Sequence, residues 1–218
     1  MRVLDVCRSG MPHLQFNQGS VMKILNLYSG LGGNRKLWGN DHQITAVELD
    51  PAIAKIYKDQ YPNDNVVNGD AHEFLLKNYK DFDFIWSSPP CPTHSSFRFN
   101  IQVRYRGTAV EYPDMKLYQE IIFLKHHFEG QWVVENVKPY YQPLINPTFV
   151  LQRHYFWSNF AVSHKEFQSD NIRGAQIPDL QALHGIDLTN YKIPEKRKLL
   201  RNCVHPPVGL HILNEAIK

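Results

Sequence analysis

Short apolar segments alternate with helical patterns along this 218-residue chain, and this alternation restricts its fold more than any other feature. The strand-like segments are 24–28, 44–48, 65–67, 82–86 and 132–135. Helical patterns follow Gly33 and cover 51–60, 72–79, 115–127 and 211–217. Such alternation predicts an α/β fold, an open and mostly parallel Rossmann-like sheet with helices on both faces.

The length and the spacing of these segments predict one folded unit with a small insertion. A chain of this length with 43% hydrophobic residues supports one core rather than two. Residues 1–21 show no periodicity and predict a poorly structured extension. Residues 22–157 and 198–218 then form the main domain, and the largely polar segment 158–197 forms the insertion. The aromatic residues at 155–157 could form a base-stacking surface. Paired strands more often bury such residues, so we predict that they belong to the core.

Basic residues gather in two segments, although the formal net charge is only +3. Residues 92–110 contain no acidic side chain, and their basic residues are Arg98, Arg104 and Arg106. Residues 191–205 carry a second group, which includes Lys196 and Arg197. This distribution is typical of a phosphate-binding surface, while a plain solvated face is the alternative.

The three cysteines, Cys7, Cys91 and Cys203, are widely spaced. Their number and spacing fit neither a disulfide framework nor paired zinc ligands, so we expect a reducing compartment and no metal site. No apolar run reaches the roughly 18 residues that a membrane span needs. We therefore expect a cytoplasmic monomer without membrane contact.

A glycine-rich turn follows the first strand, and acidic residues follow the second and third. Glycines at this place let a ligand approach the backbone, and an acid after the second strand can accept hydrogen bonds from ribose hydroxyls. Asp70 can meet an adenine amino group or simply cap the next helix. The turn lacks a complete G-x-G-x-x-G pattern, which favours S-adenosylmethionine over a dinucleotide. The residues predicted to bind this cofactor are Tyr28, Ser29, Gly30, Leu31, Gly32, Gly33, Glu48, Asp70 and Ala71.

A cysteine among prolines follows the fourth strand, and a glutamate ends the fifth. The prolines around Cys91 stiffen its turn and hold the thiol at the edge where α/β sheets bind ligands. A buried structural thiol is the alternative. Glu135 emerges from an apolar strand, where partial burial would raise its pKa and suit it to proton donation.

In chain order these motifs resemble those of the cytosine-5 DNA methyltransferase family, in a small form. The resemblance rests on the glycine turn at 28–33, Glu48, Gly69-Asp70, Pro89-Pro90-Cys91, Glu135-Asn136-Val137, Gln152-Arg153 and the closing segment 202–207. It implies that the Cys91 thiolate attacks carbon 6 of a cytosine flipped from double-stranded DNA, and that Glu135 binds N3 of the ring. Arg153 would hold Glu135 and the base, with an exposed salt-bridging arginine as the alternative. Pro89 and Asn202 would join the cofactor site, and the five basic residues named above would contact DNA.

Several positions depart from the family pattern. Pro92 replaces the usual glutamine, His94 stands where an aromatic residue is common, Arg201 replaces a glycine, and the motif at Arg153 has one arginine instead of two. The insertion is also short, so it would be only a minimal recognition subdomain. An amino-methyltransferase acting on cytosine N4 or adenine N6, the same chemistry on RNA, and an inactive DNA-binding module remain alternatives. The recognition sequence and the biological role stay open.

Overall fold

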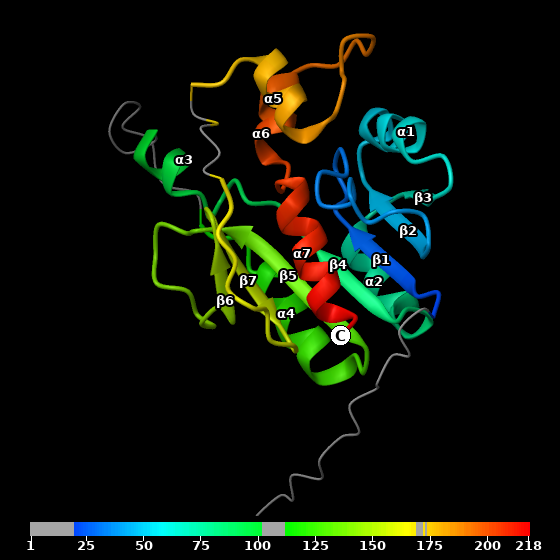
Figure 1. Cartoon of the computed structure of the whole chain (residues 1–218). Coiled ribbons are helices and arrows are strands. Elements are labelled where there is room, and N and C mark those ends of the chain that lie inside the picture. The colour runs from blue at the N-terminus through cyan, green and yellow to red at the C-terminus, as the bar shows by residue number, and fades with distance from the viewer. Residues whose placement is uncertain (1–19, 102–111, 169–171, 173) are drawn as a thin grey trace, which may run out of the picture.

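The computed structural model describes residues 20–101, 112–168, 172 and 174–218, and these form a seven-stranded sheet flanked by helices (Figure 1). The strands are β1 (Lys23–Leu27), β2 (Gln43–Glu48), β3 (Asn65–Asn68), β4 (Phe84–Ser87), β5 (Gln131–Val137), β6 (Phe149–Leu151) and β7 (His154–Ser158). Their order is β3-β2-β1-β4-β5-β7-β6. The first five are parallel, whereas β7 is antiparallel to β5 and β6. The predicted open, mostly parallel sheet is confirmed.

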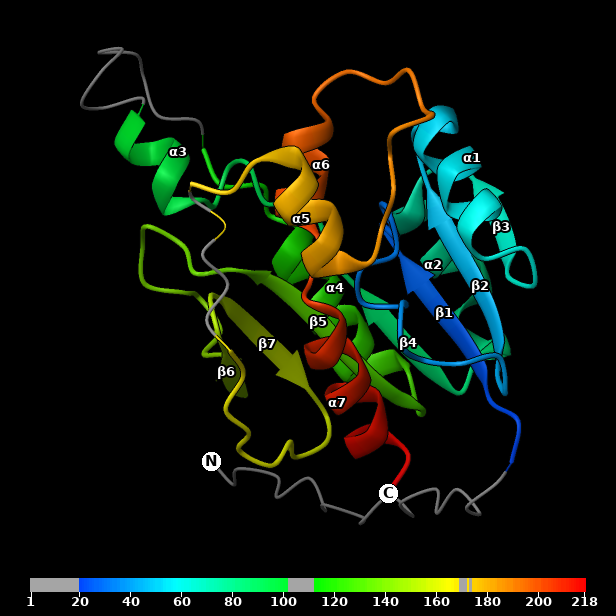
Figure 2. The same cartoon turned by 45° about the horizontal axis from the view of Figure 1, so that its top comes forward.

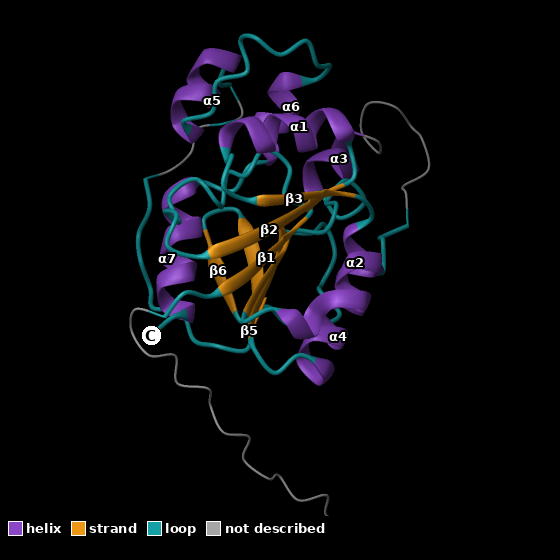
Figure 3. Cartoon of the chain, turned by 90° about the vertical axis from the view of Figure 1, so that its right-hand side faces the viewer, coloured by secondary structure: helices purple, strands orange, loops and turns teal. Residues whose placement is uncertain are grey.

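Helices cover both faces of this sheet, as predicted (Figure 3). They are α1 (Pro51–Gln60), α2 (Ala71–Asn78), the 3₁₀ turn η1 (Tyr79–Asp81), α3 (Ser96–Ile101), α4 (Lys116–His127), α5 (Ile177–His184), α6 (Lys196–Asn202) and α7 (Pro206–Ala216). In β4, Phe84 and Trp86 pack in the core under α7, whereas Ile85 packs toward α2 and α4. This alternation follows from the two-residue period of a strand.

The aromatic segment of β7 belongs to the core, which confirms that prediction. Phe156 and Trp157 are buried. Phe156 packs under α7 with Trp86, and Trp157 packs on the opposite face of the sheet.

Residues 33–37 form consecutive turns and Trp38 a bend, so the helix predicted after Gly33 is wrong. Their backbone hydrogen bonds span three residues, from Lys36 N to Gly33 O and from Trp38 N to Arg35 O. Side-chain contacts account for the difference, because Asn34 donates to Asn26 Oδ1 at 2.8 Å and Arg35 binds a distant carboxylate. These long-range contacts fix the segment more strongly than its local helical pattern does.

The helices α5 and α6 lie side by side at the end of the sheet toward which β1 and β4 point (Figure 2). Their buried Leu180 and Leu200 share an apolar cluster with Leu31 and with Ile56 of α1. Helix α6 runs across residue 198, where the sequence pattern predicted a boundary. Of the predicted extension 1–21, residues 1–19 lie outside the described residues.

A buried ion pair joins the turns after Gly33 to the segment before β3. The Arg35 Nε–Asp64 Oδ2 distance is 2.9 Å, and both side chains are 3% exposed. Tyr57 also donates to Asp64 Oδ2 at 2.9 Å, and Arg35 lies over the Tyr61 ring.

Asp64→Asn is therefore expected to lower the free energy of unfolding by about 3 kcal/mol, because it leaves the Arg35 charge buried without its partner. Urea denaturation measures this change. Asp59→Asn is the matched control, since the Lys55–Asp59 pair is exposed and solvent screens it. Equal losses in the two variants would contradict the expected role of burial.

Candidate active site

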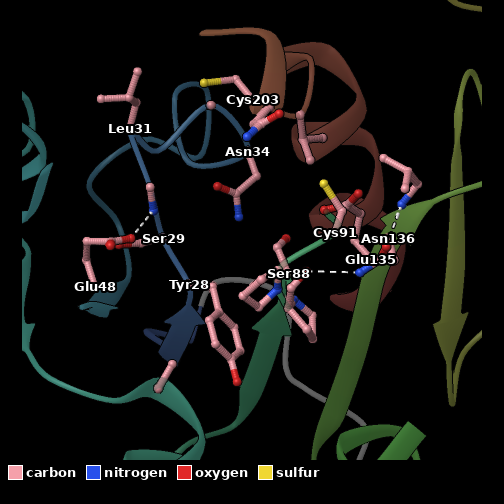
Figure 4. Close-up of a pocket in the computed structure, with 18 of the residues that line it drawn as sticks. Tyr28, Ser29, Leu31, Asn34, Glu48, Ser88, Cys91, Glu135, Asn136 and Cys203 are labelled. Carbon is pink, nitrogen blue, oxygen red and sulfur yellow. Dashed lines mark hydrogen bonds between the residues drawn. The ribbon is translucent and has the colours of Figure 1, made fainter. Parts of the chain in front are cut away.

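A pocket of about 400 Å³ opens at the carboxyl ends of β1, β4 and β5 (Figure 4). The chain order reverses between β1 and β4, and open α/β sheets bind ligands at such a point. The predicted residues that line it are Tyr28, Ser29, Gly30, Leu31, Gly33, Glu48, Asp70, Ala71, Pro89, Cys91, Glu135, Arg153 and Asn202. The structure thus brings the predicted cofactor and catalytic residues together, apart from Gly32.

Gly32 lies behind the glycine turn and does not line the pocket. Its φ is +74°, and a Cβ there would lie 2.5 Å from the Tyr61 ring. At Gly33, which does line the pocket, a Cβ would lie 2.7 Å from the Cβ of Cys203. Both glycines let the backbone approach a neighbour that a side chain would displace. The predicted place of Gly32 in the pocket wall is therefore corrected to support of the turn.

The turn leaves an open polar cradle in front of Gly30. The Gly30 N–H donates to Glu48 Oε2 at 2.9 Å, and a Cβ on Gly30 would meet no atom within 4 Å. The Ser29 hydroxyl is buried and has no hydrogen-bond partner among the described residues. A free cradle with a carboxylate and an unsatisfied hydroxyl fits the ribose and amino groups of an adenosine-containing ligand.

Asp70 combines a pocket position with a capping role. Its Oδ1 accepts a hydrogen bond from the Glu73 N–H at 2.9 Å and so caps α2. This backbone hydrogen bond lowers the pKa of the Asp70 carboxyl. Asp70 therefore presents an ionised acceptor at the pocket rim, as either predicted role requires.

Cys91 is half-buried in the loop after β4, and its carbonyl oxygen accepts hydrogen bonds from the His94 and Ser95 N–H groups at 3.0 and 3.1 Å. The Asn136 amide donates to Pro89 O at 2.9 Å, which ties this loop to β5. Burial, and then the negative charge of Glu135, raise the pKa of the thiol to about 11. The thiol of the free protein is therefore protonated at neutral pH.

Glu135 is a buried carboxyl group with a raised pKa. Its side chain is 8% exposed, and burial raises its pKa to about 7 against the opposing effects of a Ser88 hydrogen bond and the Arg153 charge. His154 Nε2 lies 3.5 Å from Glu135 Oε1. Burial lowers the pKa of His154 well below its usual range, so this ring is neutral beside the carboxyl.

Arg153 is half-buried in the turn directly before β7, and its guanidinium contacts the end of α6. Its Nη2 donates to Arg201 O at 2.7 Å and to Cys203 O at 3.4 Å. Its positive charge lowers the pKa of both the Cys91 thiol and the Glu135 carboxyl. The alternative of an exposed surface arginine is therefore wrong.

The pocket also contains residues that the sequence analysis did not assign. These are Asn34, Leu49, Ile53, Ser88, Pro90, Asp114, Lys116, Asn136, Val137, His154, Leu199, Cys203 and Val204. Some carried a signal, because Asn136 belongs to the Glu-Asn-Val motif and Cys203 to the closing segment. Asn34 directly follows the predicted turn, whereas Leu199 reaches the pocket through packing with the cluster that contains Leu31 and Ile56.

The predicted DNA-contacting residues lie outside the pocket wall or outside the described residues. Lys196 and Arg197 are half-buried on α6, where Arg197 Nε donates to Ala175 O at 3.1 Å. Arg98 lies on α3, but its side chain is not among those described, and Arg104 and Arg106 lie in the undescribed segment 102–111. Their contact with nucleic acid stays a prediction.

The family model for C-5 cytosine-specific DNA methylases matches residues 22–143, which is more than half of the chain. The chain therefore belongs to the C-5 cytosine-specific DNA methylase family. Methyl transfer from S-adenosylmethionine is the reaction of this family.

Three proteins are similar to parts of this chain, and the chain spans less than two thirds of the length of each. A tRNA (cytosine(38)-C(5))-methyltransferase of Spodoptera frugiperda is 36% identical over 75 residues, which make up 32% of this chain and 23% of that protein. A methyltransferase of Agrobacterium tumefaciens has a TM-score of 0.41 at 14% identity, over 56% of this chain and 40% of its own. A putative DNA modification methyltransferase of an E. coli prophage has a TM-score of 0.41 at 17% identity, over 81% and 56%.

No helix among the described residues combines the length and apolar composition needed to cross a bilayer. In the same part of the chain, no three histidine, cysteine, aspartate or glutamate side chains gather as metal ligands.

Proposed function

We propose that this chain methylates carbon 5 of cytosine in double-stranded DNA through a covalent bond between Cys91 and the base. The observation that carries the proposal is the common pocket of Cys91, Glu135 and Arg153 with the glycine turn. In this proposal the Cys91 Sγ adds to carbon 6, and the electron pair of the 5,6 double bond moves to carbon 5. The Glu135 carboxyl gives its proton to N3 of the ring, which neutralises the charge that the addition creates. After methyl transfer, solvent removes the proton from carbon 5. The electrons of that carbon–hydrogen bond restore the 5,6 double bond, the Cys91 thiolate leaves carbon 6, and N3 returns its proton to Glu135.

The cofactor would occupy the half of the pocket that faces the glycine turn. When bound, S-adenosylmethionine supplies an electrophilic methyl group to carbon 5. Glu48 would accept hydrogen bonds from the ribose and Asp70 from the adenine amino group, beside the open cradle at Ser29 and Gly30. Leu31, Gly33, Ala71, Pro89 and Asn202 would complete the wall, with the Tyr28 ring below it.

Glu48→Ala is expected to weaken binding of S-adenosylhomocysteine about 10-fold or more, because two charge-assisted hydrogen bonds to the ribose are lost. Isothermal titration calorimetry measures the affinity. Glu73→Gln, on the exposed side of α2, is the control that should bind like the unchanged protein. An unaltered affinity in Glu48→Ala would contradict this placement of the ribose.

The nucleic-acid partner would lie over Cys91, with the base flipped into the pocket. Arg98, Arg104, Arg106, Lys196 and Arg197 would contact phosphates or bases, and residues 158–197 would serve as a small recognition region. We propose a monomer that acts in the cytoplasm.

RNA is the second candidate substrate, because the relative from S. frugiperda is named for its action on tRNA. Matched DNA duplexes and RNA hairpins that contain 5-fluorocytosine distinguish the two. Fluorine at carbon 5 prevents the final elimination, so the true substrate should remain attached to Cys91 in the presence of cofactor, as denaturing gels and peptide mass spectrometry would show. Trapping on RNA alone would replace the DNA assignment. Absence of any adduct on both polymers would overturn the covalent mechanism and favour the alternatives without a thiol nucleophile.

A further inference from the structure

A fully buried carboxylate lies behind the pocket and takes no part in the chemistry described above. Glu120 on α4 is 0% exposed. It accepts hydrogen bonds from the hydroxyl groups of Tyr28 and Ser87, and His72 Nδ1 lies 3.1 Å from its Oε1. A buried carboxylate is costly without such donors, so this group is held firmly between three elements.

Each of these partners begins or adjoins a segment that lines the pocket. Tyr28 opens the glycine turn after β1. Ser87 ends β4 directly before the loop that leads to Cys91. His72 follows Asp70 and Ala71 at the start of α2.

Of the three partners, Tyr28 has an unfavourable backbone conformation. Its backbone φ is +54°, in the left-handed region that non-glycine residues rarely occupy. Burial, and then Glu120, raise the pKa of its hydroxyl, so the hydroxyl stays a donor. The hydrogen bond to Glu120 also raises the pKa of His72. Hydrogen bonding to α4 thus helps to hold a backbone conformation that the tyrosine disfavours when unsupported.

We infer that Glu120 is a positioning residue, which aligns the glycine turn, the loop before Cys91 and the start of α2 into one cofactor-binding wall. The inference rests on the proposed cofactor site. Glu120 does not line the pocket itself, so its effect on the cofactor passes through Tyr28, Ser87 and His72.

Glu120→Gln tests this directly, because the amide keeps the shape of the side chain but cannot accept from all three partners. We expect its dissociation constant for S-adenosylhomocysteine, measured by calorimetry, to rise by about 10-fold to 100-fold. The KM for S-adenosylmethionine should rise in parallel, while kcat at saturating cofactor changes much less. Tyr28→Phe keeps the ring and removes one hydrogen bond, so it should show a smaller rise.

Glu73→Gln is again the matched control, since it removes an exposed charge from a neighbouring helix. If Glu48→Ala lowers the affinity for S-adenosylhomocysteine but a folded Glu120→Gln variant binds it unchanged, the inference about Glu120 is overturned and the proposed cofactor site stands. No binding by the unchanged protein, or no effect of Glu48→Ala, would instead overturn the proposed site. If Glu120→Gln does not fold, Tyr28→Phe and Ser87→Ala decide the question, and unchanged affinity in both overturns the inference.

Discussion

Cys91→Ser is expected to reduce methyl transfer to cytosine by on the order of 10⁴-fold, because a serine hydroxyl is a far weaker nucleophile than a thiolate. Transfer of a radiolabelled methyl group to DNA measures the rate, and 5-fluorocytosine DNA should leave no adduct on the variant. Binding of S-adenosylhomocysteine should stay within about threefold, because the substitution replaces one atom beside the proposed cofactor site.

Cys7→Ser is the control, at a cysteine outside the described residues. Activity of Cys91→Ser close to that of the unchanged protein would favour an amino-methyltransferase. Such an enzyme uses the exocyclic nitrogen of the base as nucleophile and needs no thiol. A loss of both activity and cofactor binding would point to a damaged pocket, which calorimetry detects.

Glu135→Gln is expected to lower kcat/KM by about 10³-fold near neutral pH, because the amide cannot give a proton to the ring. The active form needs one proton on Glu135 and none on Cys91. In the free protein the pKa of Glu135 is about 7 and that of Cys91 is about 11. Between pH 7 and pH 11 the two groups therefore share one proton. In the unchanged protein kcat/KM should therefore rise with pH up to about 7 and then level off.

In Glu135→Gln only the thiol titrates, so kcat/KM should continue to rise with pH above 7. The pH profiles of the two proteins, measured under conditions that keep both folded, check this difference. Identical profiles with a limb near pH 7 in both would assign that limb to another group.

The same carboxyl group makes stability depend on pH. Its pKa is about 7 in the folded protein and 4.5 without the fold, so the folded state binds more protons between these values. The stabilisation is complete below pH 4.5 and is lost as the pH rises to 7, by about 3 kcal/mol in total. Glu135→Gln should lack this loss, which urea denaturation at pH 5 and pH 8 would show by comparison with the unchanged protein.

Local signals in the sequence were sufficient for much of the fold. Helix α1 begins and ends where its pattern predicts, because Pro51 starts it and the Asp50 side chain caps its first N–H groups. The helix prediction after Gly33 was wrong because the conformation of this segment depends on contacts with Asn26 and Asp64, which lie outside it in the sequence. Helices α5 and α6 are short and are stabilised by packing on Leu31 and Ile56, a contact that no local period reveals.

In the candidate site, too, residues marked by local sequence were predictable and residues placed by long-range contacts were not. Cys91 and Glu135 were predictable because prolines and an apolar strand mark the ends of neighbouring parallel strands. The contact of Arg153 with the carbonyl groups of residues 201 and 203 was not predictable, because it joins the turn before β7 to a segment nearly fifty residues later. Asp114 lies directly before the predicted helix 115–127 and Lys116 lies in its first turn, but nothing local shows that they face a pocket.

The direction of α7 has a practical consequence for interaction measurements. The helix starts two residues after the pocket residue Val204 and rises by roughly 16 Å over its 11 residues. In Figure 1 it runs toward the end of the sheet opposite the glycine turn. Immobilising the protein on a sensor chip through Lys218 would thus keep the mouth of the cavity facing the flowing analyte.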